Sequence, residues 1–341
     1  MDDCNSRLKA AGIATLASAF GLVAGPVSAI TNADAASGGD LTAPANRTSA
    51  GACGATSQAM FHACAPDAQA SHAIDVAKCL NVRNAKERKD CQDAARSDLE
   101  DAFALCPRQL AARQQVCKLV GPGRYDPVLD PANFSHSTKI TNTYFPLVPW
   151  TTFLHKTVNP SNPSKTLEID RFTVTERAKI ILGVTCVVVH DRAFADGELI
   201  EDTFDYFAQD NDGNVWYFGE ATSQLENGIV VGMEGAWQAG VDHAKPGIVM
   251  KAHPMVGDSY RQEFALGDAE DAATVKTLTA SASVPYGSYD RTLLETYEYS
   301  GLEPDAKENK FFAPGVGQVL TIDRVTGDRE ELVHITHQTS D

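Results

Sequence analysis

Two hydrophobic patterns divide the chain. Residues 71–82 and 85–105 are rich in Ala, Leu, Lys, Glu and Asp and contain neither Pro nor Gly, a composition typical of helices. After Phe134 the pattern changes to short runs of Val, Ile, Phe, Tyr and Thr separated by Gly, Asn, Asp and Pro, which is typical of strands joined by turns. The predicted strands are Thr151–Thr157, Thr166–Ala178, Val184–Phe194, Leu199–Gln209, Val215–Glu220, Ile229–Glu234, Ser259–Ala265, Asp271–Ser281, Leu293–Ser300, Glu308–Ala313, Gly317–Arg324 and Arg329–His334.

The order of these elements predicts an α+β fold. Consecutive strands without intervening helices imply an antiparallel sheet, and about a dozen strands are expected to curl into a barrel, half-barrel or sandwich. We divide the chain into a signal peptide (1–35), a disordered leader (36–50), a six-cysteine helical domain (51–120), a linker (121–133) and an antiparallel β domain (134–338).

The cysteines predict how the helical segment is held together. Of eight cysteines, six lie between positions 53 and 117, and they form three nested pairs centred on Ala85. Separations of 11 and 15 residues within each arm rotate by only about 20° and 60° on a helix, so each arm carries its cysteines on one side. Six cysteines allow fifteen connectivities, and an antiparallel hairpin turning near Ala85 selects one of them. The predicted disulfides are Cys53–Cys117, Cys64–Cys106 and Cys79–Cys91.

Two prolines and one further cysteine add to this prediction. Pro66 and Pro107 are expected to break the helical arms just beyond the middle disulfide. Cys186 lies in the apolar run 184–189, where a buried free thiol is the simplest expectation. The chain contains no C-x-x-C, so the disulfides are expected to be structural rather than redox-active.

The N-terminus predicts export. Arg7 and Lys9 precede the apolar run Ala10–Gly25, and cleavage sites are expected after Ala29 or Ala35. A permanent anchor is the alternative, but the run is shorter than the roughly 20 residues that span a bilayer, and no later segment is longer and more apolar. The protein is therefore expected to be periplasmic or secreted, without a membrane span after cleavage.

The net charge of the chain limits the classes of partner that it is expected to bind. A formal net charge of −16 argues against nucleic acid or an anionic membrane, both of which require clustered Lys and Arg. No G-x-S-x-G, H-E-x-x-H, phosphate-binding loop or dinucleotide fingerprint occurs in a suitable context. The sequence therefore offers no established catalytic motif.

Two turns allow neighbouring strands to be aligned. Asp196–Gly197 is a strong two-residue turn signal, and Asp210–Gly213 is expected to form the next turn rather than a calcium loop. Centring the first turn places His190 opposite Thr203. Centring the second places Asp205 opposite Phe218.

This alignment brings three chemical groups together. His190, Asp205 and Glu220 would lie on one face of three neighbouring strands. An imidazole and two carboxylates suit acid–base chemistry or one divalent metal ion, so these residues are both the candidate catalytic residues and the candidate metal ligands. The alternative is a solvated outer face, because antiparallel sheets commonly have one, and a one-residue slip would scatter the cluster.

Four aromatic residues are candidate ligand contacts. Trp216 and Phe218 belong to an aromatic run, and Trp237 and Tyr260 flank a long, poorly patterned connection. Loops over barrel mouths often contact ligands. We therefore expect a ligand-binding protein for a small molecule, a lipid or a metal ion, with a metal-assisted hydrolase or isomerase and an envelope interaction module as alternatives.

Four motifs support a resemblance. They are QDNDGNVWYFGE (Gln209–Glu220), PGIVM (Pro246–Met250), GDSYRQE (Gly257–Glu263) and APGVG (Ala313–Gly317). The region from about Thr141 to Leu332 that contains them resembles a family of exported bacterial proteins to which no activity is assigned. The resemblance implies export and carries over no catalytic residue.

Overall fold

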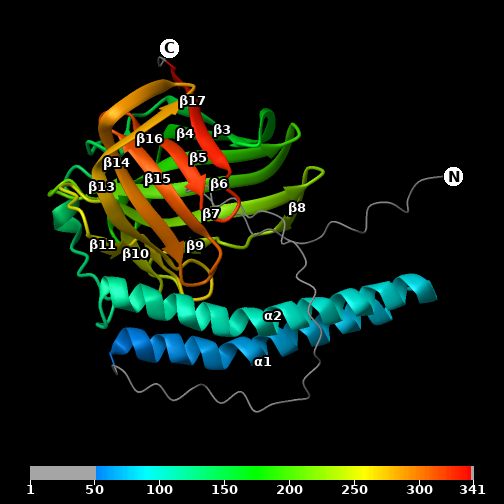
Figure 1. The fold of residues 1–341 in the computed structure, drawn as a ribbon. Coiled ribbons are helices and arrows are strands. Elements are labelled where there is room, and N and C mark those ends of the chain that lie inside the picture. The colour runs from blue at the N-terminus through cyan, green and yellow to red at the C-terminus, as the bar shows by residue number, and fades with distance from the viewer. Residues whose placement is uncertain (1–50, 339–341) are drawn as a thin grey trace.

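A long helical hairpin lies along one side of a large β barrel (Figure 1). The computed structural model describes residues 51–338, so the predicted signal peptide and leader lie outside the described residues. The α+β architecture predicted from the sequence is confirmed. None of the described helices combines the length and apolar character needed to cross a bilayer.

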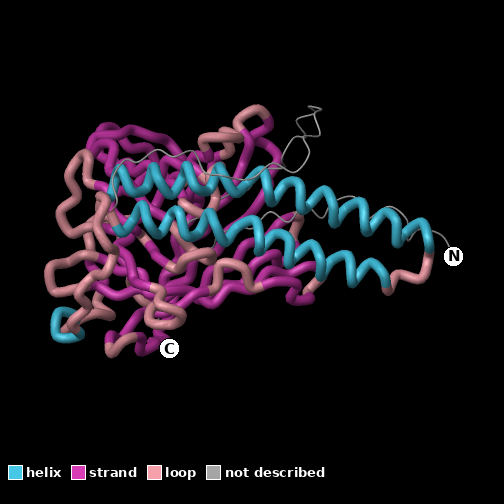
Figure 2. Tube along the Cα trace, turned by 90° about the horizontal axis from the view of Figure 1, so that it is seen from below, coloured by secondary structure: helices cyan, strands magenta, loops and turns pink. Residues whose placement is uncertain are grey.

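The hairpin consists of α1 (Ala52–Leu80) and α2 (Ala85–Val120). Asn84 caps α2 because its side chain accepts hydrogen bonds from the backbone N–H groups of Lys86 and Glu87. Three disulfides, spaced along the hairpin, join its two arms. They are the predicted nested pairs, Cys53–Cys117, Cys64–Cys106 and Cys79–Cys91. The end of the hairpin that carries the α1–α2 turn projects beyond the barrel (Figure 2).

The prolines do not break the arms, contrary to the prediction. Pro66 lies inside α1 and Pro107 lies inside α2. Each proline removes one backbone hydrogen bond. Because the Cys64–Cys106 disulfide lies next to both prolines, the neighbouring arm holds each helix in line across the defect.

The β domain forms one fifteen-stranded antiparallel sheet, with a separate two-stranded pair, β1–β2. A short 3₁₀ helix, Pro131–Phe134, precedes it. The strands are β1 (Ile140–Thr141), β2 (Pro146–Leu147), β3 (Thr151–Asn159), β4 (Asn162–Ile181), β5 (Val184–Ala195), β6 (Glu198–Gln209), β7 (Val215–Glu226), β8 (Ile229–Gly232), β9 (Trp237–Gln238), β10 (Lys245–Met250), β11 (Ser259–Arg261), β12 (Glu263–Phe264), β13 (Asp271–Val284), β14 (Gly287–Ser300), β15 (Lys307–Ala313), β16 (Gly317–Asp323) and β17 (Arg329–His337).

The sheet closes almost completely on itself. Its strand order is β11-β13-β14-β15-β16-β17-β3-β4-β5-β6-β7-β10-β12, with β8 and β9 each pairing with β7 outside this path. The last strand of the chain, β17, therefore pairs with β3 in the middle of the sheet. The two ends of the sheet meet because β10 contacts β11 and β12 contacts β13. This arrangement removes most exposed strand edges, and it directs alternate side chains into a common interior.

The barrel interior has an apolar and a polar section. The apolar section joins buried side chains of the sheet to Phe145 and Leu147, which come from the segment around β1 and β2. Its sheet residues include Phe153, Val174, Val189, Phe207, Leu320 and Leu332. The polar section contains His155, Asp191, Thr203, Asp205, Glu220, Glu308, Lys310, Thr321 and Glu330, all nearly inaccessible to solvent.

The β5–β6 hairpin turns where the sequence predicts, but its register does not follow the prediction. Asp196 and Gly197 have φ values of 50° and 87°, as a tight two-residue turn of this kind requires. A β-bulge two residues further along then shifts the pairing by one residue, so His190 lies opposite Phe204 instead of Thr203. A one-residue shift moves a side chain to the other face of a sheet.

The β6–β7 hairpin differs from the prediction by two residues. Its loop spans residues 210–214, and a second irregularity follows along the strands, so Asp205 lies opposite Glu220 rather than Phe218. A shift of two residues in the pairing leaves each side chain on the same face of the sheet. Asp205 and Glu220 therefore share the barrel interior, where both are buried.

The hairpin is attached to the barrel by polar contacts from α2. Arg113 and Glu270 form a two-pronged ion pair with both nitrogen–oxygen distances at 2.7 Å, and their side chains are 6% and 2% exposed. The Gln109 amide donates to the backbone carbonyl of Leu302 at 2.8 Å. Cys186, at the other side of the fold, is buried and is the one unpaired cysteine among residues 51–338, as expected.

Candidate metal centre

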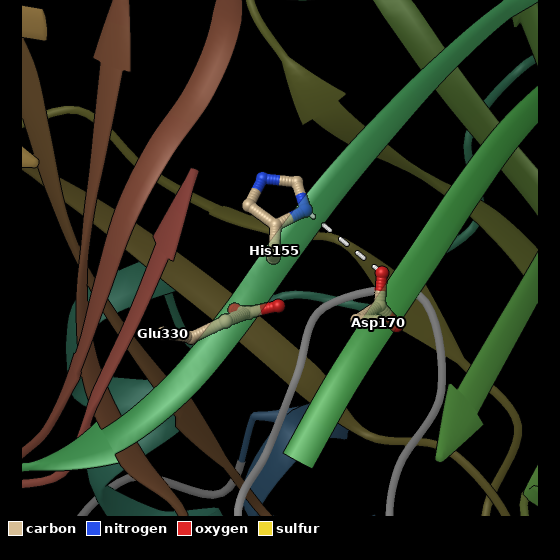
Figure 3. Close-up of side chains that lie close together, drawn as sticks. All are labelled: His155, Asp170 and Glu330. Atoms are coloured by element: carbon tan, nitrogen blue, oxygen red, sulfur yellow. Dashed lines mark ion pairs between the residues drawn. The ribbon is translucent and has the colours of Figure 1, made fainter. Parts of the chain in front are cut away.

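Three potential metal ligands meet inside the barrel where its first and last strands adjoin. His155 lies on β3, Asp170 lies directly opposite it on β4, and Glu330 lies on β17, the other neighbour of β3. One ligand atom from each residue lies within 4.8 Å of the other two. Figure 3 shows the three side chains converging on one point.

The spacing of these atoms suits a single ion. Metal–ligand bonds of about 2.0–2.6 Å allow two ligand atoms on one ion to be at most about 4.0–5.2 Å apart. The group therefore needs only small side-chain movements to bind a common ion.

The tautomer that binds a metal ion is favoured by the surroundings of His155. Its Nε2 lies 3.4 Å from the backbone carbonyl of Gln318, an oxygen that can only accept, so Nε2 carries the proton and donates. Its Nδ1 then presents a lone pair toward Asp170, whose Oδ1 is 3.9 Å away. Metal-binding histidines commonly donate their second ring N–H to a carbonyl in this way.

Gln318 also orients the carboxylate of Glu330. Its side-chain amide donates to Glu330 Oε2 at 3.2 Å and to Thr321 Oγ1 at 3.0 Å. One residue of β16 therefore positions two of the three candidate ligands. Such supporting contacts fix the geometry of a site before an ion binds.

Asp170, with 17% of its side chain exposed, and the buried Asp191 form an acid pair beside His155. Burial raises the pKa of Asp170 well above its usual value, the Glu330 carboxylate raises it further, and a hydrogen bond with Asp191 acts in the opposite direction. Burial and then the neighbouring Asp170 carboxylate raise the pKa of Asp191. Asp191 is 7% exposed, and its Oδ1 has no hydrogen-bond partner among the described residues.

The surrounding field is negative. Burial, and then repulsion by Glu330 and Glu201, raises the pKa of Glu168 to about 7. The charged groups that act on Glu168, Asp170 and Asp191 are all carboxylates, with no lysine or arginine among them. Buried carboxylates without counter-charges are costly, so this position favours a cation.

A small cavity adjoins the three ligands. It has a volume of about 40 Å³, and His155, Asp170, Asp191 and Glu330 line its polar side. Phe145, Leu147, Phe153 and Phe172 line the apolar side. Because one water molecule needs about 10–15 Å³ of such cavity volume, the cavity has room for an ion and a few waters.

His190 does not belong to this or any other interior cluster, so its predicted convergence with Asp205 and Glu220 is wrong. The bulge described above turns His190 outward, where its ring stacks on Phe204 with centroids 4.4 Å apart. Its Nε2 lies 2.6 Å from Asp202 Oδ1, and the side chain is 26% exposed. His190 is therefore a half-exposed partner of Asp202.

Asp205 and Glu220 do meet, and Tyr217 joins them. The Tyr217 hydroxyl donates to Asp205 Oδ1 at 2.7 Å and lies 3.1 Å from Glu220 Oε2. Burial raises the pKa of both carboxyl groups, and each is raised further by a neighbouring carboxylate. Without the histidine, this group is an acid pair rather than the predicted metal or catalytic triad.

The four predicted aromatic ligand contacts separate into two pairs. Phe218 and Trp237 are core residues, at 0% and 6% exposure, and the Trp237 indole donates to Glu263 at 3.0 Å. Trp216 and Tyr260 line a second, larger cavity between the helical hairpin and the barrel. The structure thus places only the second pair beside space that a ligand would need.

His155, Asp170 and Glu330 are not among the site residues predicted from the sequence. One signal was present, because His155 occupies an inward position of a strand whose neighbouring inward positions are Phe153 and Thr157, all of them buried. A histidine at such a position is expected to have a specific partner. The partners, however, lie 15 and 175 positions further along the chain.

Comparison of the chain with known family models, curated proteins and solved structures finds no match. The function therefore has to be argued from the site itself.

Proposed function

We propose that this protein is an exported metal-binding β-barrel protein that holds one divalent cation at His155, Asp170 and Glu330. The observation that carries the proposal is the oriented His155 Nδ1 facing the carboxylates of Asp170 and Glu330, with one ligand atom of each residue within 4.8 Å of the other two. Asp191, with its unpartnered oxygen, is the candidate for a fourth ligand.

The donor set selects the class of ion. One imidazole nitrogen with carboxylate oxygens suits Zn²⁺ or Mn²⁺, whereas Ca²⁺ and Mg²⁺ prefer sites made of oxygen alone. The small volume of the cavity leaves room for water but not for an organic substrate. These two features favour metal binding over a metal-assisted hydrolase or isomerase.

The proposed location rests on the disulfides. Three disulfides in one hairpin persist in an oxidising compartment and are rare in a reducing cytosol. This supports a periplasmic or secreted protein, as the resemblance also implies. N-terminal sequencing of the exported protein tests it, because export predicts a chain that begins after Ala29 or Ala35.

Metal analysis and calorimetry test the binding site. We expect the full chain, purified without chelator, to carry one Zn²⁺ or Mn²⁺ per molecule and to rebind it after dialysis against EDTA. Glu330→Gln removes one charged ligand and is expected to weaken binding by more than about tenfold. In a ¹⁵N spectrum the Nδ1 signal of His155 should shift on metal addition.

A neighbouring residue supplies the matched control. Glu331 follows Glu330 on β17 and directly precedes Leu332, the residue that pairs with His155. Its side chain faces the other side of the sheet, where it pairs with Arg329 at 2.6 Å. Glu331→Gln makes the same chemical change outside the barrel, so its metal affinity should equal that of the wild type. Absence of binding in the wild type, or equal affinities for Glu330→Gln and Glu331→Gln, would refute the proposal.

A further inference from the structure

The helical hairpin and the barrel enclose a second cavity, far larger than the one beside His155. Its volume is about 440 Å³, within the range of about 300–1,000 Å³ that is common for small-molecule sites. Its walls come from α1, α2, the linker that follows α2, and the barrel strands β10 and β11. The hairpin thus forms one side of a chamber whose other side is the barrel.

The charge in this cavity is opposite to that of the protein. Arg113, Arg124, Arg261 and Glu270 are the charged residues that line it, although the chain as a whole carries −16. Glu270 forms its ion pair with Arg113 and also acts electrostatically on Arg261, so two buried guanidinium groups share one carboxylate. Arg124 is exposed, which leaves one buried positive charge in excess.

Arg261 is buried without an ion pair of its own. It is 8% exposed, and among the described residues its Nε has no hydrogen-bond partner and no carboxylate lies within ion-pair distance. Within residues 51–338 the one hydrogen-bond contact of its guanidinium is a weak one, 3.6 Å from the Cys53 sulfur. A guanidinium carries five N–H donors, so most of its capacity to bind an anion is unused.

Aromatic rings surround this guanidinium. Arg261 lies over the ring of Phe264, with its central carbon 4.7 Å from the centroid, and 5.7 Å from that of Tyr125. These contacts stabilise the cation and hold the plane of the guanidinium in a defined orientation. A rigid donor group is better prepared to bind an anion than a mobile one.

The rest of the cavity lining is mainly apolar. It includes Val116, Val120 and Ile248, with Trp216 among the aromatic residues. Tyr260 precedes Arg261 on β11 and directs its side chain to the other face of the strand, where it packs against Ala273 and Val275. The cavity therefore combines one fixed guanidinium with a mostly apolar lining.

We propose that this cavity binds a small organic carboxylate with an apolar or aromatic body. The carboxylate would pair with the Arg261 guanidinium, while the body packs against the aromatic and aliphatic walls. A monoanion fits this single guanidinium, whereas a phosphate would need more donors than Arg261 offers. This site is separate from the proposed metal centre, and neither depends on the other.

Paired probes test the charge requirement. 2-Naphthoate and 2-naphthylmethanol have the same ring system, but only the first carries a charge. In calorimetric titrations of the full, oxidised chain, we expect naphthoate to bind at least about tenfold more tightly than the alcohol, the value of one charge-assisted hydrogen bond. Equal binding of the two probes, or no binding of naphthoate, would overturn the proposal.

Variants test the residues. Arg261→Gln should abolish the preference for naphthoate, and Arg261→Lys should retain part of it because the charge remains. Should Arg261→Gln fail to fold, Thr56→Trp tests the same cavity from α1, because Thr56 lines it. Ala55→Trp is its matched control, since Ala55 is exposed and does not line the cavity.

We expect Thr56→Trp to lose naphthoate binding and Ala55→Trp to retain it. A folded Arg261→Gln variant that still prefers naphthoate would show that the guanidinium is not the anion site. Equal binding by the two tryptophan variants would show that the carboxylate binds elsewhere.

Discussion

The buried acid pair Asp205 and Glu220 makes the stability of this protein depend on pH in a defined direction. We consider the double variant Asp205→Asn/Glu220→Gln, which removes both titrating groups while keeping their shapes. In the fold, burial raises the pKa of both carboxyl groups well above their usual values. In the unfolded chain they titrate near about 3.9 and 4.3.

The sign follows from proton linkage. Above about pH 5 the unfolded chain has lost these protons, whereas the raised pKa values of the folded chain favour their retention. The stability that the pair contributes is therefore fully present below the unfolded pKa values and falls as the pH rises toward the folded ones. Each proton retained by the fold lowers the unfolding free energy by about 1.4 kcal/mol per pH unit.

Urea unfolding at pH 5, 6 and 7, with EDTA present, measures the effect. Relative to the wild type, we expect the double variant to gain stability between pH 5 and pH 7, by up to about 3 kcal/mol, the limit set by one retained proton over two pH units. Asp212→Asn/Glu226→Gln removes the same charge from two exposed positions near the same hairpin and should leave the slope unchanged. Parallel pH profiles for the wild type and the buried double variant would refute the reasoning.

Three further predictions concern stability. Replacing Cys53 and Cys117 by Ser opens the outer loop of the hairpin and should lower the free energy of unfolding by about 3 kcal/mol. Thermal unfolding followed by the helical circular-dichroism signal measures this loss. As long as the two inner disulfides stay intact, adding a reducing agent should cause no further loss. Arg113→Leu leaves the Glu270 carboxylate buried without a partner and should cost about 3–5 kcal/mol in urea unfolding, and the double variant with Glu270→Leu should recover part of it; an additive loss would count against the ion pair. Gly219→Ala should destabilise the barrel by about 2 kcal/mol or more, because φ is +129° and the new Cβ would lie 2.3 Å from a backbone oxygen; a melting temperature equal to that of the wild type would contradict this.

The helical hairpin was predictable in detail, but the prolines within it were not. The pairing of six cysteines depends only on distances along two stiff helices, and these distances are set by residue spacing. The continuation of α1 and α2 through Pro66 and Pro107 depends on the opposite arm, which local sequence preferences do not describe.

The β domain was predictable as a set of strands, while its registers were not. The turn at Asp196–Gly197 forms as expected because Asp and Gly tolerate positive φ. The bulges that follow it have no comparable sequence signal, and a single bulge transfers His190 from the interior to the outer face. Between β6 and β7 a longer loop and one irregularity together shift the pairing by two residues, which leaves Asp205 and Glu220 on the expected face.

By itself, therefore, the sequence determined the class of fold, the disulfide pairing and the turn positions, because each depends on residues close together in the chain or on the rigid spacing of a helix. Only the tertiary structure decided which polar side chains meet. His155, Asp170 and Glu330 come together because β17 pairs with β3 when the barrel closes, and Arg261 has no ion pair of its own because Arg113 of the docked hairpin pairs with Glu270. Both sites arise from contacts between distant segments, and such contacts are selected by the packing of the whole barrel rather than by any local pattern.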